Sequence, residues 1–188
     1  MAEIYAVLTG DLVKSSELSA EELDEVRSSF LSAADEARKW KRGLIKGKPE
    51  FFRGDAWQMV VADPAWALRV GLFLRATTIG FHKVDTRLVI AMGTVEKINT
   101  RRISLSTGEA FKRSGEGLDG LGKKTHMAIL LPPESGFFAG WMNVVAKLTD
   151  SLVKSWTKRQ AEIVRLALLP EGLTQQEIAE RVELYRDG

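Results

Sequence analysis

The apolar pattern of this chain predicts an α+β fold in which the elements follow the order β-α-β-β-α-β, with a helical segment after them. Two observations carry the prediction. Short apolar runs rich in β-forming residues mark four strands, and two stretches with helical spacing of apolar residues lie between them. The chain also has enough material for one complete core, since 45% of its 188 residues are hydrophobic.

Four strands are expected in the first half of the chain. Ile4 to Leu8 is an apolar run that ends at Thr9-Gly10-Asp11, which is typical of a buried strand and its turn. Residues 51–61 carry apolar runs on both sides of Gly54-Asp55, a pattern that predicts two short strands in a tight hairpin. Arg87 to Val95 is apolar on both faces and predicts a buried fourth strand.

The two helices between these strands have recognisable ends. Ser19 and Glu22 form a capping-box pattern, and apolar residues then recur at helical spacing up to Trp40. Asp63 and Pro64 begin the second helix, because aspartate caps a helix and proline suits its first turn. The complete order is that of ferredoxin-like domains, in which helices cover one side of an antiparallel sheet.

Past the fourth strand, the pattern predicts a short helix, a loop and one more strand. Thr107 to Ser114 is expected to form the helix, and the glycine-rich stretch from Gly115 to Lys124 a mobile loop. Met127 to Leu131 is apolar and is followed by two prolines, which predicts a further strand. We expect one domain at residues 1–135 and a helical segment at residues 136–188.

The helical segment resembles the first part of a helix-turn-helix. After a helix expected over residues 138–153, Thr157 to Leu169 predicts a second helix, Gly172-Leu173 a turn, and Thr174 with Glu177 the cap of a third. One hypothesis is therefore a transcriptional regulator that uses these helices on DNA, with the larger domain as sensor or dimeriser. A recognition helix would have to come next, and too few residues follow, so we expect no sequence-specific DNA binding by this chain.

The composition excludes several classes of protein. The chain has no cysteine, which rules out disulfides, thiolate zinc sites and a cysteine nucleophile. Lysine and arginine number 27 against 25 aspartates and glutamates, a balance too even to indicate a nucleic-acid binder. The first residues lack the pattern of a signal peptide, and no stretch approaches the roughly 20 apolar residues of a membrane span. We therefore expect a cytoplasmic protein without a membrane partner.

Two aspartates are candidate metal ligands. Asp11 follows the first strand and Asp55 lies in the hairpin turn, and a split β-α-β order brings both to one edge of the sheet. Two carboxylates repel each other unless protons or cations lie between them, and Mg²⁺ or Mn²⁺ binds carboxylate and phosphate oxygens readily. The pair therefore predicts a metal site that binds a nucleotide or another phosphorylated ligand. The alternative is structural, because Gly-Asp is common in turns and aspartate caps helices.

Three short motifs resemble one known family. Residues 8–16 (LTGDLVKSS), 53–58 (RGDAWQ) and 88–93 (LVIAMG) are similar to the SatD family, which is similar in fold to class III nucleotide cyclases and more remotely to polymerase palm domains. The resemblance implies a fold of that type, with Asp11 and Asp55 at the positions of the two metal-binding aspartates. It also implies Mg²⁺ or Mn²⁺ as cofactor, a homodimer and, if the chain is an enzyme, metal-dependent nucleotidyl or phosphoryl transfer.

Further residues are expected to contact the nucleotide or phosphate. They lie in the motifs or in a basic set that could gather on one surface: Gly10, Arg53, Lys112, Arg113 and Lys123. The alternative for the basic set is a group of solvated loops. Cyclases carry an asparagine and an arginine on a later helix, where this chain has Lys112 and Glu116, and a glutamate there would repel phosphate. We therefore assign no catalytic residue, and a degenerate site is the alternative to an active one.

Overall fold

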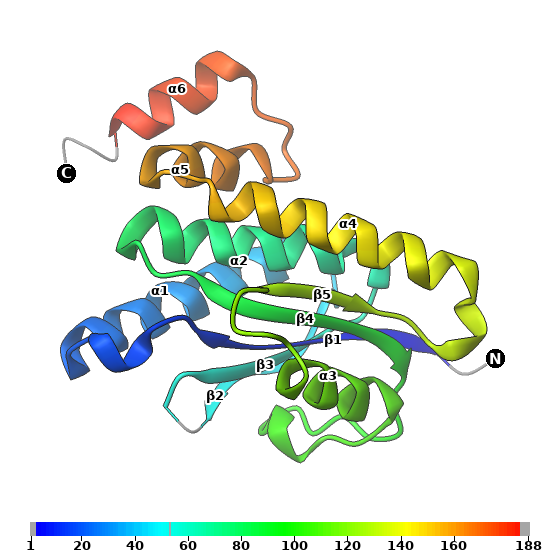
Figure 1. Ribbon diagram of the computed structural model, residues 1–188. Coiled ribbons are helices and arrows are strands. Elements are labelled where there is room, and N and C mark those ends of the chain that lie inside the picture. Colours follow the sequence, from blue (N-terminus) through cyan, green and yellow to red (C-terminus); the bar gives the residue numbers. More distant parts are fainter. Residues whose placement is uncertain (1–2, 53, 185–188) are drawn as a thin grey trace.

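The computed structural model describes residues 3–52 and 54–184, which form a mixed α/β fold (Figure 1). The strands are β1 (Ile4–Leu12), β2 (Ile45–Phe52), β3 (Ala56–Val61), β4 (Thr86–Thr94) and β5 (Met127–Leu130). The helices are α1 (Ala20–Arg38), α2 (Ala67–His82), α3 (Glu109–Asp119), α4 (Phe137–Lys154), α5 (Lys158–Ala167) and α6 (Gln175–Leu184). Short 3₁₀ turns lie at Ser15–Glu17, Pro64–Trp66, Ile103–Leu105 and Pro133–Ser135.

The five strands form one sheet in the order β2-β3-β1-β4-β5. Every neighbouring pair is antiparallel except β4 and β5, which run parallel. Because β1 lies at the centre, its backbone hydrogen bonds are satisfied on both sides, by β3 and by β4. The predicted order β-α-β-β-α-β is confirmed, and β5 adds the further strand expected from residues 127–131.

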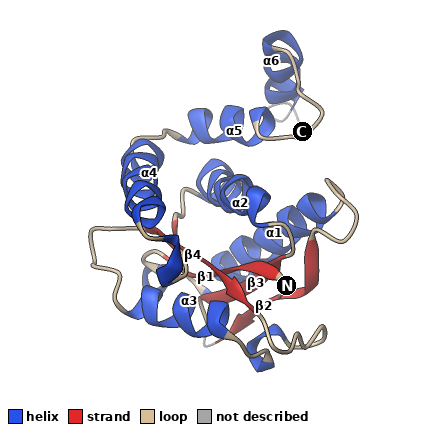
Figure 2. Cartoon of the chain, turned by 90° about the vertical axis from the view of Figure 1, so that its right-hand side faces the viewer, coloured by secondary structure: helices blue, strands red, loops and turns tan. Residues whose placement is uncertain are grey.

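The helices form layers on both sides of the sheet. Figure 2 shows α1 and α2 over one face, α3 below the other, and α5 and α6 stacked outside α2. The alternation along the central strands explains the two layers: Leu8 and Met59 belong to the core under α1 and α2, whereas Val7 and Val60 pack with Phe111 of α3. Helix α4 lies beside β5 and packs on that edge of the sheet.

The ends of the first two helices agree with the sequence prediction. The Ser19 hydroxyl accepts a hydrogen bond from the backbone N–H of Glu22, while the Glu22 side chain accepts one from the backbone of Ser19. Asp63 accepts a hydrogen bond from the backbone N–H of Ala65 and caps the turn that leads into α2. These caps satisfy N–H groups that would otherwise have no partner at a helix start.

Two local predictions are wrong. Thr9-Gly10-Asp11 is not a turn, because β1 continues to Leu12 with partners on both sides. Gly10 is required there by packing, since a Cβ atom would lie 2.1 Å from the carbonyl oxygen of Arg87 and 2.6 Å from the Trp57 ring. The stretch after Ser114 is not all loop, because α3 continues to Asp119; Gly117 lets that helix approach β5, where a Cβ would lie 2.4 Å from Leu130.

The C-terminal helices share a core with the sheet domain. Leu166 and Leu169 belong to the same buried cluster as the residues beneath α1 and α2. Arg69 of α2 donates hydrogen bonds to the carbonyl oxygens of Leu168 (2.7 Å) and Leu169 (3.0 Å), which ties α2 to the end of α5. The domain boundary predicted at residue 135 stays a prediction.

None of the helices in residues 3–52 and 54–184 has the length and apolar character needed to cross a bilayer.

Candidate functional site

An open cleft of about 650 Å³ lies where β1 ends beside the β2–β3 turn. It is lined by acidic, basic and hydroxyl side chains from four separate segments: Asp11, Lys14, Ser15, Ser16, Asp55, Arg87, Lys123 and His126, with Leu12 and Val13. The structure therefore brings the two predicted metal ligands to the same cleft, as the sequence predicted. Sequence reasoning missed Arg87 and His126.

Asp11 is held by Arg87 from the neighbouring strand. The two residues are register partners in β1 and β4, and the guanidinium contacts both carboxylate oxygens, with 2.7 Å between Arg87 Nε and Asp11 Oδ1. The hydrogen bond from Arg87 to Asp11 and the charges of Asp11, Asp55 and Asp119 raise the pKa of Arg87 against the opposing effect of burial. The guanidinium is therefore the positive charge that relieves the repulsion between the carboxylates.

The main chain of Asp11 is fixed by a buried relay. Trp57 Nε1 donates a hydrogen bond to the hydroxyl of Thr86 (2.8 Å), which donates to the carbonyl oxygen of Asp11 (2.7 Å). Because Trp57 is fully buried, the relay holds the end of β1 rigidly against the core.

Asp55 is held by the segment that follows β1. The Ser15 hydroxyl donates to the Asp55 carboxylate, and the Leu12 N–H donates to the Asp55 carbonyl oxygen at 3.2 Å. Lys14, just before Ser15, adopts a left-handed conformation (φ 59°) at the start of the 3₁₀ turn that follows β1.

The donor set fits a cation that is shared with a ligand. Among the described residues, no three His, Asp or Glu side chains gather into a group that could hold a metal ion by themselves. Two carboxylates are nevertheless the set with which proteins bind Mg²⁺ when phosphate oxygens and water complete the coordination. A cation between Asp11 and Asp55 would compete with Arg87 for the Asp11 carboxylate.

A second cleft of about 590 Å³ adjoins the first across the Asp11–Arg87 pair, which lines both. Its other lining residues come from β1, the β2–β3 hairpin, the 3₁₀ turn at Ile103–Leu105 and α3: Thr9, Phe52, Ala56, Gln58, Ser104, Gly115, Leu118 and Asp119. Gln58 donates a hydrogen bond to Thr9 (3.0 Å), whose hydroxyl also bonds Ser114 of α3 at 2.9 Å. This cleft is less charged than the first and offers apolar and amide surfaces.

His126 belongs to a buried ionic network behind the first cleft. Its Nδ1 lies 2.8 Å from Asp85, and because a carboxylate only accepts hydrogen bonds, Nδ1 is the donor in this contact. Arg75, which is fully buried, contacts Asp85 through two nitrogens (2.7 and 2.9 Å) and Asp150 of α4 at 3.2 Å. Burial alone would raise the pKa of Asp85, but the hydrogen bonds from His126 and Arg75 lower it to about 2.

The predicted phosphate contacts are divided by the structure. Lys123 lines the first cleft with the two aspartates. Gly10 is buried beneath Trp57, and Arg113 donates to the Met92 carbonyl oxygen of β4 (2.8 Å), so neither lines the two clefts described above; Lys112 is exposed on α3 and is also outside their lining. Arg53 lies outside the described residues.

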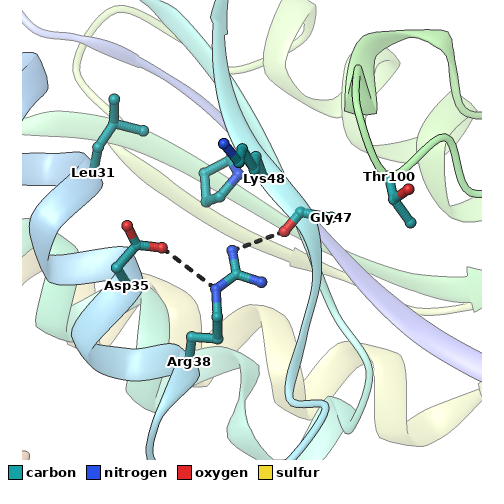
Figure 3. A pocket seen from close by; sticks show the side chains of 7 residues that line it. Leu31, Asp35, Arg38, Gly47, Lys48 and Thr100 are labelled. Carbon is teal, nitrogen blue, oxygen red and sulfur yellow. Dashed lines mark hydrogen bonds and ion pairs between the residues drawn. The ribbon is translucent and has the colours of Figure 1, made fainter.

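A third cleft, of about 490 Å³, lies between α1 and the bulged part of β2 (Figure 3). Arg38 lines this cleft, but its guanidinium already binds protein groups. Its guanidinium donates to the carbonyl oxygens of Ile45 (3.1 Å) and Gly47 (2.8 Å) and contacts Asp35 at 3.3 Å. The arginine therefore ties the edge strand β2 to α1.

No protein-family model matches the chain, and no curated protein matches it. The solved structures that match include the guanylyl cyclase Cya2, at 16% sequence identity and a TM-score of 0.48, over 74% of this chain and 81% of that chain.

Proposed function

We propose that the chain binds a phosphorylated ligand, with a nucleoside triphosphate as the first candidate, together with Mg²⁺ or Mn²⁺ in the cleft that Asp11 and Asp55 share. The observation that carries the proposal is the lining of this cleft. Two carboxylates stand beside Lys14, Arg87 and Lys123, so one open site offers oxygen ligands for a hard cation and positive groups for phosphate oxygens.

In this proposal Asp11 and Asp55 hold the cation, which neutralises phosphate charge when it is bound. Lys123 and Arg87 contact the phosphates directly, and the ring of His126 lines the same cleft beside them. The second cleft takes the rest of the molecule, because Phe52 and Leu118 offer apolar surface and Gln58 an amide that can bond a base edge. Clefts of a few hundred Å³ are typical of small-molecule sites.

We also assign the domain to the ferredoxin-like type of the nucleotide cyclases and palm domains, and to the SatD family. Support for the fold type comes from the strand order β2-β3-β1-β4 in an antiparallel arrangement, with α1 and α2 on one face. Support for the family comes from the three motifs quoted above, two of which meet at the cleft.

Thermal unfolding with and without Mn²⁺ and ATP or GTP tests the proposed site. Mass action predicts that Mn²⁺ raises the melting temperature and that nucleotide raises it further, since a ligand that binds only the folded state stabilises it by about 2.7 kcal/mol at a hundred times its Kd. Asp55→Asn should abolish the gain from Mn²⁺. Lys123→Ala should keep that gain and reduce the extra gain from nucleotide.

Asp35→Asn is the matched control, because Asp35 lines the unrelated third cleft and should leave both gains unchanged. If the unmodified protein shows no shift with Mn²⁺, with or without nucleotide, the proposal fails. If Asp55→Asn shifts as the parent does, the cation binds elsewhere and Asp55 is a turn residue only.

The alternative hypothesis, a DNA-binding regulator, stays a prediction. Thr174 caps α6 and Gly172 adopts a left-handed conformation (φ 68°) in the turn before it, as the sequence predicted.

A further inference from the structure

Helix α4 has two very different faces. Ala146, Asp150 and Val153 are buried, and Asp150 fixes the helix by contacting Arg75 of α2 (3.2 Å) and accepting a hydrogen bond from the backbone N–H of His126 (2.9 Å). The opposite face carries five large apolar side chains in solvent, which we call the α4 stripe: Phe137 (83% exposed), Trp141 (56%), Val144 (48%), Leu148 (63%) and Leu152 (64%).

The stripe is continuous along the whole helix. Its members follow one another at intervals of four, three, four and four residues, which places them on one narrow line of an α-helix. Four intervals over 15 residues are close to the 3.6-residue turn of an α-helix, so the row stays on one face along the whole helix. Phe138, 60% exposed, widens the apolar surface at the N-terminal end.

Exposed large apolar residues outside α4 are scattered. Leu105 and Ile163, for example, lie on different elements and expose single side chains, which is normal for a protein surface. A row of adjacent apolar side chains is different, because water is excluded from the whole row at once when a partner covers it. The surface therefore indicates a partner with an apolar face of similar length.

We propose that a second copy of this chain covers the stripe, with the two α4 helices packed antiparallel about a twofold axis near Val144. At roughly 150–250 Å² for a whole aromatic side chain, the stripe exposes on the order of 600 Å² per copy, so a pair buries about 1,200 Å², which reaches the size of specific interfaces. The partner surface is then identical to the stripe in length and chemistry, as a twofold contact requires.

We infer the antiparallel direction from the side chains at the two ends of α4, which are aromatic at the N-terminal end and leucines at the C-terminal end. It places the bulky Phe137 and Trp141 of one copy against Leu148 and Leu152 of the other, and it sets the two helix dipoles in opposite directions. Gly140 and Ser151 are small, exposed residues next to the stripe, so the helices can approach closely. A membrane surface is a poorer match, because helices that lie on membranes carry a charged face opposite the apolar one, and here that face is packed inside the protein.

Sedimentation of the full chain over a range of concentrations tests the proposal. We expect a dimer that becomes a monomer when Trp141 and Leu148 are both changed to Glu, with an unchanged melting temperature at low protein concentration because both side chains are exposed. Leu105→Glu is the matched control, since it changes an equally exposed leucine on another element and should leave the dimer intact.

Because the chain has no cysteine, single cysteines report the geometry without background. Val144→Cys should form a disulfide-linked dimer on mild oxidation, and a mixture of Phe137→Cys and Leu152→Cys chains should form the mixed dimer in preference to either homodimer. Leu105→Cys should stay monomeric in denaturing gels. A monomeric parent chain, or crosslinking of Val144→Cys no faster than that of Leu105→Cys, would overturn the proposal; a monomer that sediments with vesicles of phosphatidylserine and phosphatidylcholine would assign the stripe to a membrane instead.

Discussion

Arg75 and Arg87 both pair with aspartates, yet their surroundings differ completely. Arg75 has no exposed surface and contacts Asp85 and Asp150, while His126 and Lys154 bond the same carboxylates. Arg87 is 28% exposed at the cleft, and its partner Asp11 is reached by solvent as well. The first group surrounds a fully buried arginine and joins α2 and α4 to the residues just before β4 and β5, and the second is a partly exposed pair that lines two clefts.

This difference in burial indicates which of the two arginines can take part in ligand binding. A buried pair cannot exchange partners, because removing one charge leaves the other without water or a counter-ion. A pair that water reaches, such as Arg87 with Asp11, can exchange one partner for another ion at a smaller cost. We therefore expect Arg75 to govern stability and Arg87 to govern ligand binding, and the following predictions test that division.

The largest effect is expected from Arg75→Met. The change leaves the carboxylates of Asp85 and Asp150 buried without their shared cation, and breaking a buried pair in this way costs about 3–5 kcal/mol. Urea unfolding at neutral pH measures the loss. A cost below about 1 kcal/mol would show that the network is solvated and would remove the contrast with Arg87.

A smaller effect is expected from acid. The pKa of Asp85 falls from its usual 3.8 to about 2 in the folded protein, so its charged form stabilises the fold fully above about pH 4 and this contribution is lost as the pH falls through 2. The shift corresponds to about 2 kcal/mol. Urea unfolding of the parent and of Asp85→Asn at a series of acidic pH values isolates the contribution of Asp85 to the free energy of unfolding. The other carboxylates contribute equally to the two proteins, so their effect cancels in the difference.

In that series the parent should lose more stability than Asp85→Asn between about pH 4 and pH 2, and the variant should already be less stable at neutral pH. Parallel curves for the two proteins would contradict a lowered pKa for Asp85.

The smallest effect on stability is expected from Arg87→Met. Because water reaches both side chains of this pair, unfolding without ligand should change less than it does for Arg75→Met. If the proposed site exists, removing the guanidinium should strengthen Mn²⁺ binding, since the competitor for Asp11 is gone, and should weaken the additional effect of nucleotide, since a phosphate contact is lost. Calorimetric titration with Mn²⁺ alone and then with ATP measures the Mn²⁺ affinity and the nucleotide affinity separately. If Arg87→Met weakens the two affinities equally, Arg87 only shapes the cleft.

Local order was predictable where neighbouring residues in the sequence decide it. The capping box of Ser19 and Glu22 and the hairpin around Asp55 involve residues a few positions apart, and the structure has both. The prediction was wrong for Thr9-Gly10-Asp11 and for the glycines after Ser114, because glycine was taken as a sign of a turn or loop. In both places glycine instead allows close packing, of Trp57 over β1 and of β5 against α3, and only the tertiary structure shows those neighbours.

The sequence by itself therefore determined the elements, their order and the meeting of Asp11 with Asp55, because apolar periodicity and turn residues act locally and a split β-α-β order brings both aspartates to one edge. The tertiary structure alone decided the partners of the charged groups. Asp11 pairs with Arg87 across 76 positions and Asp85 with His126 across 41, and no periodicity links residues so far apart. Such pairs depend on strand register and on which side chains the packed helices bring together, so their chemistry appears only when the chain is folded.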